Sequence, residues 1–216
     1  KIQVKNLLFS ILAASRSKIK FNKIIESIKD IKPVEGRLEI IGKIKNSSKV
    51  ILDYAHTPDA LKYTLESIKE QFGQSAISIV FGCGGDRDKD KRSIMGKIAN
   101  QYCNKIFLTD DNPRYENPKK IRNQIKKKIT RSKLVEISSR KKAIRIAIEN
   151  LNSGDILLVA GKGHEIYQEY SGKKNFFSDK KYILKEINSK NVKLFKNWKA
   201  NILNEKCNLS LVNKKL

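Results

Sequence analysis

The residues best suited to binding chemistry form one loop, Asp110-Asp-Asn-Pro-Arg114, which directly follows an apolar run. Pro113 has a fixed φ and disfavours the helical conformation at Asn112, so the neighbouring side chains are held on a stiff turn. A carboxylate, an amide and a guanidinium on such a turn can together bind one small zwitterion. The alternative is an Asx-turn whose acids only accept hydrogen bonds from backbone amides. This loop alone does not decide between the two.

Three more polar loops follow apolar runs, and they contain both histidines of the chain. They are Asp53-Tyr-Ala-His56, Gly82-Cys-Gly-Gly-Asp-Arg-Asp88 and Gly161-Lys-Gly-His-Glu165. Arg87 and Arg114 offer planar donors to carboxylates. The side chains of Asp111, Asn112 and Glu165 can accept hydrogen bonds from an ammonium. These two opposite sets of partners predict a zwitterionic, amino-acid-like ligand.

The glycines of the second loop, Gly82, Gly84 and Gly85, are expected to let the backbone approach the ligand closely. Taken alone they are weak evidence, and no G-x-x-x-x-G-K-[ST] phosphate loop occurs in these residues. His56 could contact a phosphate or a ribose, although a histidine at a strand end is as often structural. The alternative is that the four loops are polar only because loops generally are. That alternative predicts mainly Ser, Asn and Lys, whereas Asp, His, Arg and Gly recur in these loops.

A regular alternation of strands and helices must position these loops. Apolar strands are predicted at 38–44, 50–54, 76–81, 106–109, 134–137 and 156–160, with a shorter one near 166–170. Helices are predicted from Pro58, over 91–102, 118–129 and 140–150, and from Asp179 to about Ile187. Continuous apolar strands that alternate with helices indicate an α/β fold, with a mostly parallel sheet and helices on both faces. Right-handed crossovers place the carboxyl end of every parallel strand at one edge, so the four loops are expected to converge there.

The two ends of the chain depart from this alternation. Residues 1–31 show two amphipathic helices with no strand between them, and 33–37 have the composition of a turn and linker. We expect 1–34 to be the end of an upstream domain and the chain to be part of a longer protein. Residues 189–216 do not continue the pattern and are predicted to form a helical or disordered tail without an assigned function.

The formal net charge of +24 would ordinarily suggest nucleic-acid binding. The lysines are, however, spread over nearly every segment together with many Ile and Asn, so we favour a general drift in composition. Cys83, Cys103 and Cys207 have no spacing suited to a metal, which predicts a reducing cytoplasm. These residues show no secretory segment and no apolar run of about 18 residues, so no membrane contact is expected.

Five motifs, in order and at matching spacing, together resemble the Mur ligases, and most closely the branch that adds meso-diaminopimelate to UDP-N-acetylmuramoyl-L-alanyl-D-glutamate in peptidoglycan synthesis. They are Gly36-Arg-Leu-Glu39, Asp53-Tyr-Ala-His-Thr-Pro-Asp59, Gly82-Cys-Gly-Gly-Asp-Arg-Asp-Lys-Asp-Lys-Arg92, Asp111-Asn-Pro-Arg114 and Ala160-Gly-Lys-Gly-His-Glu165. The resemblance covers about residues 4–188. It implies that 35–188 form the family's Rossmann-like C-terminal domain, and that 1–34 are remnant helices of a central ATPase domain.

The resemblance also implies three groups of site residues. Those for meso-diaminopimelate are Arg87, Asp111, Asn112, Pro113, Arg114, Gly161 and Glu165. Those that face the nucleotide are Arg37, Asp53, Tyr54 and His56, and those that face the acidic substrate are Lys91 and Arg92. The resemblance assigns no catalytic residue and no metal ligand to this chain.

Members of this family use ATP and Mg²⁺ to form an amide bond. ATP phosphorylates the glutamate side chain of the UDP-N-acetylmuramoyl-dipeptide, and the amine of diaminopimelate attacks the acyl phosphate. The UDP-sugar domain has no counterpart in these residues, and neither do the phosphate loop, magnesium ligands and modified lysine of the central domain. We therefore expect this chain by itself to lack ligase activity and to work with the N-terminal and central domains of the same cytoplasmic enzyme.

Three alternatives remain open. The first is a relative that adds L-lysine or another amino acid. Lysine lacks the distal carboxylate and would leave Arg114 without a partner, at a cost of roughly 2 kcal/mol or more. The other two alternatives are a non-catalytic remnant and a basic nucleic-acid-binding module.

Overall fold

The computed structural model describes residues 2–31 and 34–212, with side chains described for 4–31, 34–195 and 197. Contacts divide the chain into two compact units, Lys1–Val34 and Glu35–Leu216. The assignment of the first unit to an upstream domain stays a prediction.

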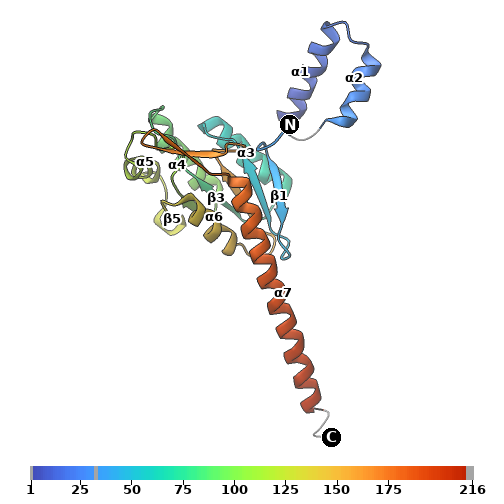
Figure 1. Cartoon of the computed structure of the whole chain (residues 1–216), viewed down its shortest axis with the longest axis vertical. Coiled ribbons are helices and arrows are strands. Elements are labelled where there is room, and N and C mark those ends of the chain that lie inside the picture. Colours follow the sequence, from blue (N-terminus) through green and yellow to red (C-terminus); the bar gives the residue numbers. More distant parts are fainter. Residues whose placement is uncertain (1, 32–33, 213–216) are drawn as a thin grey trace. The chain divides into compact units, whose positions relative to one another are not determined.

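Within its described residues, the first unit contains helices α1 (Ile2–Arg16) and α2 (Phe21–Ser27) and the short 3-10 helix η1 (Ile28–Asp30). The described part of the second unit contains a six-stranded sheet, a two-stranded hairpin and covering helices (Figure 1). Its elements are β1 (Glu39–Lys43), β2 (Lys49–Asp53), α3 (Pro58–Phe72), β3 (Ile77–Phe81), α4 (Asp90–Tyr102), β4 (Lys105–Leu108), α5 (Pro118–Lys126), η2 (Arg131–Lys133), β5 (Leu134–Glu136), α6 (Arg140–Glu149), β6 (Ile156–Ala160), β7 (Tyr167–Tyr170), β8 (Lys173–Phe176) and α7 (Asp179–Val212).

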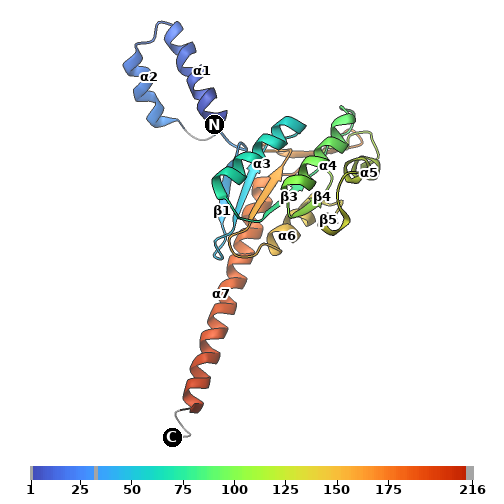
Figure 2. The same cartoon turned by 180° about the vertical axis from the view of Figure 1, so that it is seen from behind.

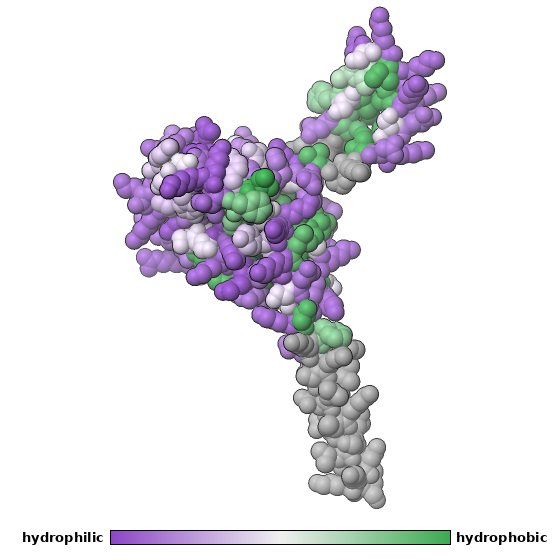
Figure 3. Space-filling model, in the orientation of Figure 1, coloured by the Kyte–Doolittle hydropathy of each residue, from purple (hydrophilic) through white to green (hydrophobic). Residues whose placement is uncertain are grey.

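Apolar side chains gather along the two helices of the first unit (Figure 3). Val4, Leu8 and Leu12 recur at helical spacing in α1, and each is more than half exposed. Ile24 of α2 is buried. The predicted pair of helices is confirmed, and much of its apolar surface is exposed within the described residues.

The central sheet has the strand order β1-β2-β6-β3-β4-β5. Neighbouring strands from β2 to β5 pair in parallel, and β1 pairs antiparallel with β2 at one edge. All five residues of β6 are buried, because a central parallel strand is covered on both faces. The predicted α/β fold, with a mostly parallel sheet and helices on both faces, is confirmed.

Helices cover both faces of the central sheet (Figures 1 and 2). Successive residues of its inner strands pack into two cores, one on each face. On one face, Ile79 and Leu158 pack with side chains of α3, α4 and α5. On the other, Val80 and Val159 pack with α6 and the first turns of α7. This alternation follows from the pleat of a strand. Helices therefore cover both faces, and the carboxyl edge is left to the loops.

Two helices that precede or follow the site loops begin at a side chain that caps the first turn. Thr57 Oγ1 accepts a hydrogen bond from the backbone N of Ala60 (3.3 Å) at the start of α3. Asn117 Oδ1 accepts one from the backbone N of Lys119 (2.9 Å) at the start of α5. Proline follows the cap in both helices, where the missing N–H costs no helical hydrogen bond. Local sequence therefore sets where the preceding loops end.

One predicted boundary is wrong, and one strand was not predicted. The last helix, expected to end at about Ile187, continues as α7 to Val212, because no Gly or Pro interrupts the sequence after residue 178. Residues 213–216 of the predicted tail lie outside the described residues. The exposed strand β8 was not predicted, and it pairs antiparallel with β7.

Charged and polar side chains cover much of the visible surface of the second unit (Figure 3). Large exposed apolar residues in this unit include Ile94, Ile166 and Phe176. Among the described helices, none combines the length and the apolar character needed to cross a membrane.

Gly96 lies in the middle of α4, where α5 approaches closely. A Cβ at this position would lie 2.1 Å from the carbonyl oxygen of Ile125, so α5 would have to move. We expect Gly96→Ala to lower the free energy of unfolding by about 1–3 kcal/mol. This direction is opposite to the gain of about 1 kcal/mol that alanine ordinarily gives inside a helix. Urea unfolding followed by circular dichroism measures the change, with Ser93→Ala in the same helix as the control, and a more stable Gly96→Ala variant would contradict this packing.

Candidate functional site

The loops that follow β2, β3, β4 and β6 line a pocket of about 420 Å³ at the carboxyl edge of the sheet. They meet because these strands are neighbours, in the order β2-β6-β3-β4. Nine of the predicted site residues line the pocket: Tyr54, His56, Arg87, Lys91, Asp111, Asn112, Arg114, Gly161 and Glu165. The other four, Arg37, Asp53, Arg92 and Pro113, are not part of its lining.

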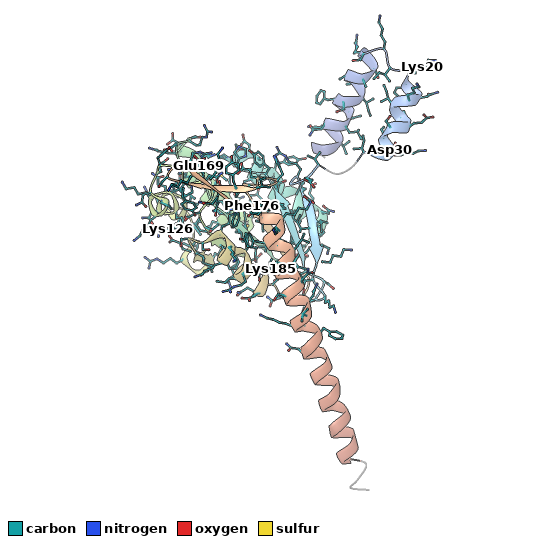
Figure 4. All side chains as sticks on the ribbon, viewed as in Figure 1. Lys20, Asp30, Lys126, Glu169, Phe176 and Lys185 are labelled. Carbon is teal, nitrogen blue, oxygen red and sulfur yellow. The ribbon has the colours of Figure 1, made fainter. Side chains whose placement is uncertain are left out.

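Two guanidinium groups reach the pocket from different loops. Arg114 has a left-handed backbone conformation (φ 52°), and its Nη1 donates a hydrogen bond to the carbonyl oxygen of Gly85 (2.8 Å). Its Nε lies 3.6 Å from Oε2 of Glu169, a residue of β7 labelled in Figure 4. Arg87 is exposed, and no hydrogen bond or ion pair holds its guanidinium within the described part of the chain. Arg114 is thus held in place by the protein, whereas Arg87 can move.

Both polar atoms of the Asn112 side chain form hydrogen bonds within the protein. Its Oδ1 accepts hydrogen bonds from Lys162 Nζ (3.0 Å) and from the backbone N of Glu169 (3.1 Å). Its Nδ2 donates a hydrogen bond to Glu165 Oε2 (3.0 Å). Because an amide oxygen accepts two hydrogen bonds, the expected contact between Asn112 and a ligand ammonium does not fit this arrangement. Asn112 instead supports Glu165.

Glu165 is a pocket carboxylate with a buried lysine behind it. Lys162 is 0% exposed, and its Nζ donates a hydrogen bond to Glu165 Oε2 (2.8 Å). Burial alone would raise the pKa of Glu165. Hydrogen bonds from Lys162 and Asn112 and the positive charge of Arg114 outweigh burial and hold this pKa below its ordinary value. Glu165 is therefore ionised at neutral pH and suited to an ammonium group.

Asp111, the second pocket carboxylate, also has a buried cation behind it. Arg140 is 1% exposed and binds Asp179 through Nε (2.8 Å) and Nη2 (2.6 Å), and its Nη2 also donates to the carbonyl oxygen of Ala160 (2.9 Å). Its Nη1 lies 3.9 Å from Asp111 Oδ2. A Cβ on Gly161, whose φ is +109°, would lie 3.0 Å from the same Asp111 oxygen. Glycine therefore lets this carboxylate approach the end of β6.

Residues expected to face the nucleotide form an aromatic cluster after β2. The Tyr54 ring meets the His56 ring edge-on, with 4.7 Å between centroids, and lies 5.4 Å from the His164 ring. The guanidinium of Arg37 lies 4.7 Å over the Tyr54 ring. Lys91 Nζ donates a hydrogen bond to the carbonyl oxygen of His56 (2.9 Å). Arg37 thus contacts the Tyr54 ring, which lines the pocket, but Arg37 is not itself a lining residue.

Asp53 is turned into the protein and does not line the pocket, and the expectation that it faces the nucleotide stays a prediction. Its side chain is buried, and its carboxylate accepts hydrogen bonds from the backbone N of Leu38 (2.8 Å) and Ala55 (2.8 Å) and from Thr64 Oγ1 (3.1 Å). Asp53 therefore ties the residues before β1 to the start of the β2 loop and to α3.

Arg92 is also turned inward, and the expectation that it faces the acidic substrate stays a prediction. It is fully buried, and its guanidinium donates to Glu116 Oε1 (2.8 Å) and Oε2 (2.9 Å), Gln124 Oε1 (2.6 Å) and the carbonyl oxygen of Gly84 (3.0 Å). Glu116 in turn accepts a hydrogen bond from the backbone N of Asp86 (2.6 Å). Arg92 therefore fixes the β3 loop against the β4 loop.

The glycines after β3 allow these two loops to pack together. A Cβ on Gly82 would lie 2.2 Å from the carbonyl oxygen of Thr109, and one on Gly85 would lie 1.9 Å from that of Pro113. Pro113 is buried. Gly82 and Gly84 also line the pocket, as expected of glycines that let the backbone approach a ligand. That Pro113 contacts the ligand stays a prediction. Both residue types shape the loops that carry the arginines.

A metal site does not form from the residues described. Among them, no group of three or more His, Cys, Asp and Glu side chains could hold a metal ion. The pocket carboxylate of Glu165 is engaged by Lys162. These residues therefore do not fit a Mg²⁺ site.

The fold and the site define an α/β domain with a polar pocket at the carboxyl edge of its sheet. A family model described as "Mur ligase, glutamate ligase domain" matches residues 36–163. The chain therefore belongs to the Mur ligase family.

Several relatives share a name. The chain is 45% identical over 188 residues to the UDP-N-acetylmuramoyl-L-alanyl-D-glutamate–2,6-diaminopimelate ligase of Rickettsia typhi, covering 86% of this chain and 37% of that protein. It is 44% identical over 177 residues to the ligase of the same name from Chelativorans sp., covering 82% and 36%. The chain thus spans a little over a third of these relatives.

Solved structures agree with the fold. A structure of a ligase of that name matches with a TM-score of 0.67 and 35% identity, covering 87% of this chain and 38% of that chain. The UDP-N-acetylmuramate-alanine ligase of Thermotoga maritima matches with a TM-score of 0.57 at 18% identity, which supports the fold alone.

Three residues that shape the pocket were not predicted as site residues: Lys162, Arg140 and Glu169. Arg140 carried a usable signal, because a cation in the first turn of a helix opposes the helix dipole and so requires a partner elsewhere. The sequence places Lys162 between two glycines of a predicted site loop, but it gives no sign that the lysine side chain is completely buried. Glu169 acts through its backbone N and its carboxylate, for which the sequence offers no local signal.

The ion pair between Arg92 and Glu116 should make stability depend on pH. Hydrogen bonds from Arg92 lower the pKa of Glu116 to about 2 in the folded protein, compared with about 4.3 in an unfolded chain. A lowered folded pKa stabilises the fold above the unfolded pKa, and this contribution is lost as the pH falls from roughly 4.5 towards 2. We expect the free energy of unfolding, measured with urea at stepped pH, to fall less steeply in Glu116→Gln than in the wild type. Glu149→Gln is the exposed control, and equal slopes for Glu116→Gln and wild type would refute this assignment.

Proposed function

We propose that this chain is the amino-acid-binding part of an ATP-dependent ligase that joins meso-diaminopimelate to UDP-N-acetylmuramoyl-L-alanyl-D-glutamate in peptidoglycan synthesis. The observation that carries the proposal is a single pocket lined by Arg87 and Arg114 as well as Asp111 and Glu165. A short molecule with an ammonium and a carboxylate at each end matches both sets of charges. The names of the Rickettsia and Chelativorans relatives support the same choice of substrate.

Each pocket residue has a role in this proposal. Arg114, held at Gly85 and beside Glu169, binds the distal carboxylate, and the mobile Arg87 closes on a carboxylate once the ligand is bound. Asp111 and Glu165 bind ammonium groups. The cluster around Tyr54 and His56 faces the nucleotide, and Lys91 faces the acidic substrate.

In the proposed reaction, the glutamate carboxylate first takes the γ-phosphoryl group of ATP, which releases ADP and leaves an acyl phosphate. The lone pair of an unprotonated diaminopimelate amine then attacks the carbonyl carbon. The carbon–oxygen bond to phosphate breaks, inorganic phosphate leaves, and the nitrogen loses a proton to solvent as the amide forms. This chain contributes by holding the amine in line, which is worth several kcal/mol of the barrier. It also helps to exclude water when the domains close.

The remaining parts of the reaction are proposed for other domains of the same cytoplasmic enzyme. ATP and Mg²⁺ would be its cofactors, held mainly by a central domain with a phosphate loop, and the UDP-N-acetylmuramoyl-dipeptide would be its second substrate. The relatives are more than twice as long as this chain, which supports this division of labour. In this view 1–34 belong to that central domain and 35–188 form the acceptor-binding domain, with 189–216 unassigned.

Arg114→Ala removes the guanidinium proposed to bind the distal carboxylate. We expect meso-diaminopimelate to bind at least about tenfold more weakly, because a charge-assisted pair is lost. L-Lysine, which has no distal carboxylate, should bind the variant and the wild type alike. Isothermal titration calorimetry of the 216-residue chain measures both affinities, with Arg145→Ala on the exposed side of α6 as the control. Equal weakening for both amino acids would argue against this role, and a wild-type preference for L-lysine would favour a lysine-adding relative.

The 216 residues alone are expected to release no phosphate from ATP when supplied with Mg²⁺, meso-diaminopimelate and the UDP-N-acetylmuramoyl-dipeptide. The physical reason is that these residues contain no phosphate loop to hold the β- and γ-phosphates. A phosphate-release assay combined with mass spectrometry of the product tests this. ATP-dependent formation of the tripeptide product by this polypeptide would show that the division of labour is wrong.

A further inference from the structure

We propose that Lys162 is the positioning residue of the amino-acid pocket: it fixes Glu165 so that one carboxylate oxygen is held by the protein and the other is left for the ligand ammonium. This inference rests on the proposed function, because it assigns a role within the same pocket.

The backbone turns the Lys162 side chain into the protein. The flanking residues Gly161 and Gly163 have φ values of +109° and +53°, conformations that other residues rarely adopt. Lys162 is 0% exposed. A lysine this deeply buried is stable only when its ammonium has partners, because the desolvation of an unpaired charge is costly.

Three groups surround the buried ammonium. Nζ donates hydrogen bonds to Asn112 Oδ1 (3.0 Å) and Glu165 Oε2 (2.8 Å) and lies 5.4 Å from the centre of the Tyr167 ring. Asn112 Nδ2 donates to the same Glu165 oxygen (3.0 Å). Oε2 of Glu165 is therefore held by two donors. Its Oε1 has no hydrogen-bond partner among the described residues, which leaves it available to a ligand.

Fixing Glu165 matters for affinity because the ligand then meets a carboxylate that is already ionised and oriented. The charged or titratable groups around Glu165 are Lys162, Arg114, Arg140, Asp111 and Tyr54. Of these, Lys162 donates the direct hydrogen bond and is the main cause that lowers the pKa of Glu165. Without it, burial would favour the protonated acid, which attracts an ammonium weakly.

Lys162→Met tests the role, since methionine keeps an unbranched side chain and loses the ammonium. We expect meso-diaminopimelate to bind at least about tenfold more weakly in calorimetry at pH 7.5. The loss should grow as the pH falls, because the pKa of Glu165 is raised in the variant and its charged fraction shrinks. Unchanged affinity in a folded Lys162→Met variant would overturn the proposal.

Lys190→Met is the matched control. Lys190 is a half-buried lysine whose Nζ donates to the carbonyl oxygens of Ile148 (2.8 Å), Glu149 (3.2 Å) and Leu151 (2.6 Å), at the far end of α6 from Arg140. Its loss should lower stability but leave the affinity for meso-diaminopimelate within about twofold of wild type. Equal loss of affinity in both variants would show only a structural effect and would overturn the proposal.

Carboxyl ¹³C NMR of the ligand-free chain separates this inference from the proposed function. We expect the pKa of Glu165 to lie below that of an ordinary glutamate in the wild type and to rise in Lys162→Met. If the pKa rises as expected but the wild type does not bind meso-diaminopimelate, the proposed function fails while the positioning of Glu165 by Lys162 stands. If Lys162→Met does not fold, the wild-type titration decides: a lowered pKa of Glu165 supports the proposal, and an ordinary or raised one overturns it.

Discussion

The carboxyl edge of the sheet depends on positive charge buried behind it. The guanidinium of Arg140 binds Asp179 at the start of α7 and the carbonyl oxygen of Ala160 at the end of β6. Removing one partner of such a buried pair typically costs about 3–5 kcal/mol, so these elements are held together strongly. Lys162 does the same for the loops after β4 and β6. Arg92 joins the loops after β3 and β4 in the same way, so three buried cations fix the loops from which the pocket is made.

The fold and the place of the site could be predicted because both follow from patterns that are continuous in the sequence. Strands such as β6 are uninterrupted apolar runs, and only a sheet covered on both faces buries them fully. Parallel pairing then forces the loops after β2, β3, β4 and β6 to one edge, whatever their contents. The convergence of Arg87, Arg114 and Glu165 on one pocket is a consequence of topology.

The direction of each side chain could not be predicted, because it depends on partners that are distant in sequence. In the sequence, Asp53 follows a strand as a ligand-binding residue would, but in the folded protein its carboxylate accepts hydrogen bonds from Thr64 and two backbone amides. The guanidinium of Arg92 likewise donates hydrogen bonds to Glu116. A motif shows which side chains lie near a pocket. How many hydrogen bonds those side chains can still form with a ligand depends on the other donors and acceptors around them.

The hydrogen-bond and ion-pair partners of Arg114 and Glu165 explain how one pocket can present both signs of charge without a direct ion pair between them. Arg114 and Glu165 line the same space, and a direct ion pair between them would exclude a zwitterion. The protein instead engages Arg114 with Gly85 and Glu169, and Glu165 with Lys162 and Asn112. Each side chain keeps some hydrogen-bonding capacity in a fixed direction. A ligand with both charges can then bind without first breaking an ion pair between Arg114 and Glu165. Because these two side chains are already oriented, little binding free energy is spent on reorganising them.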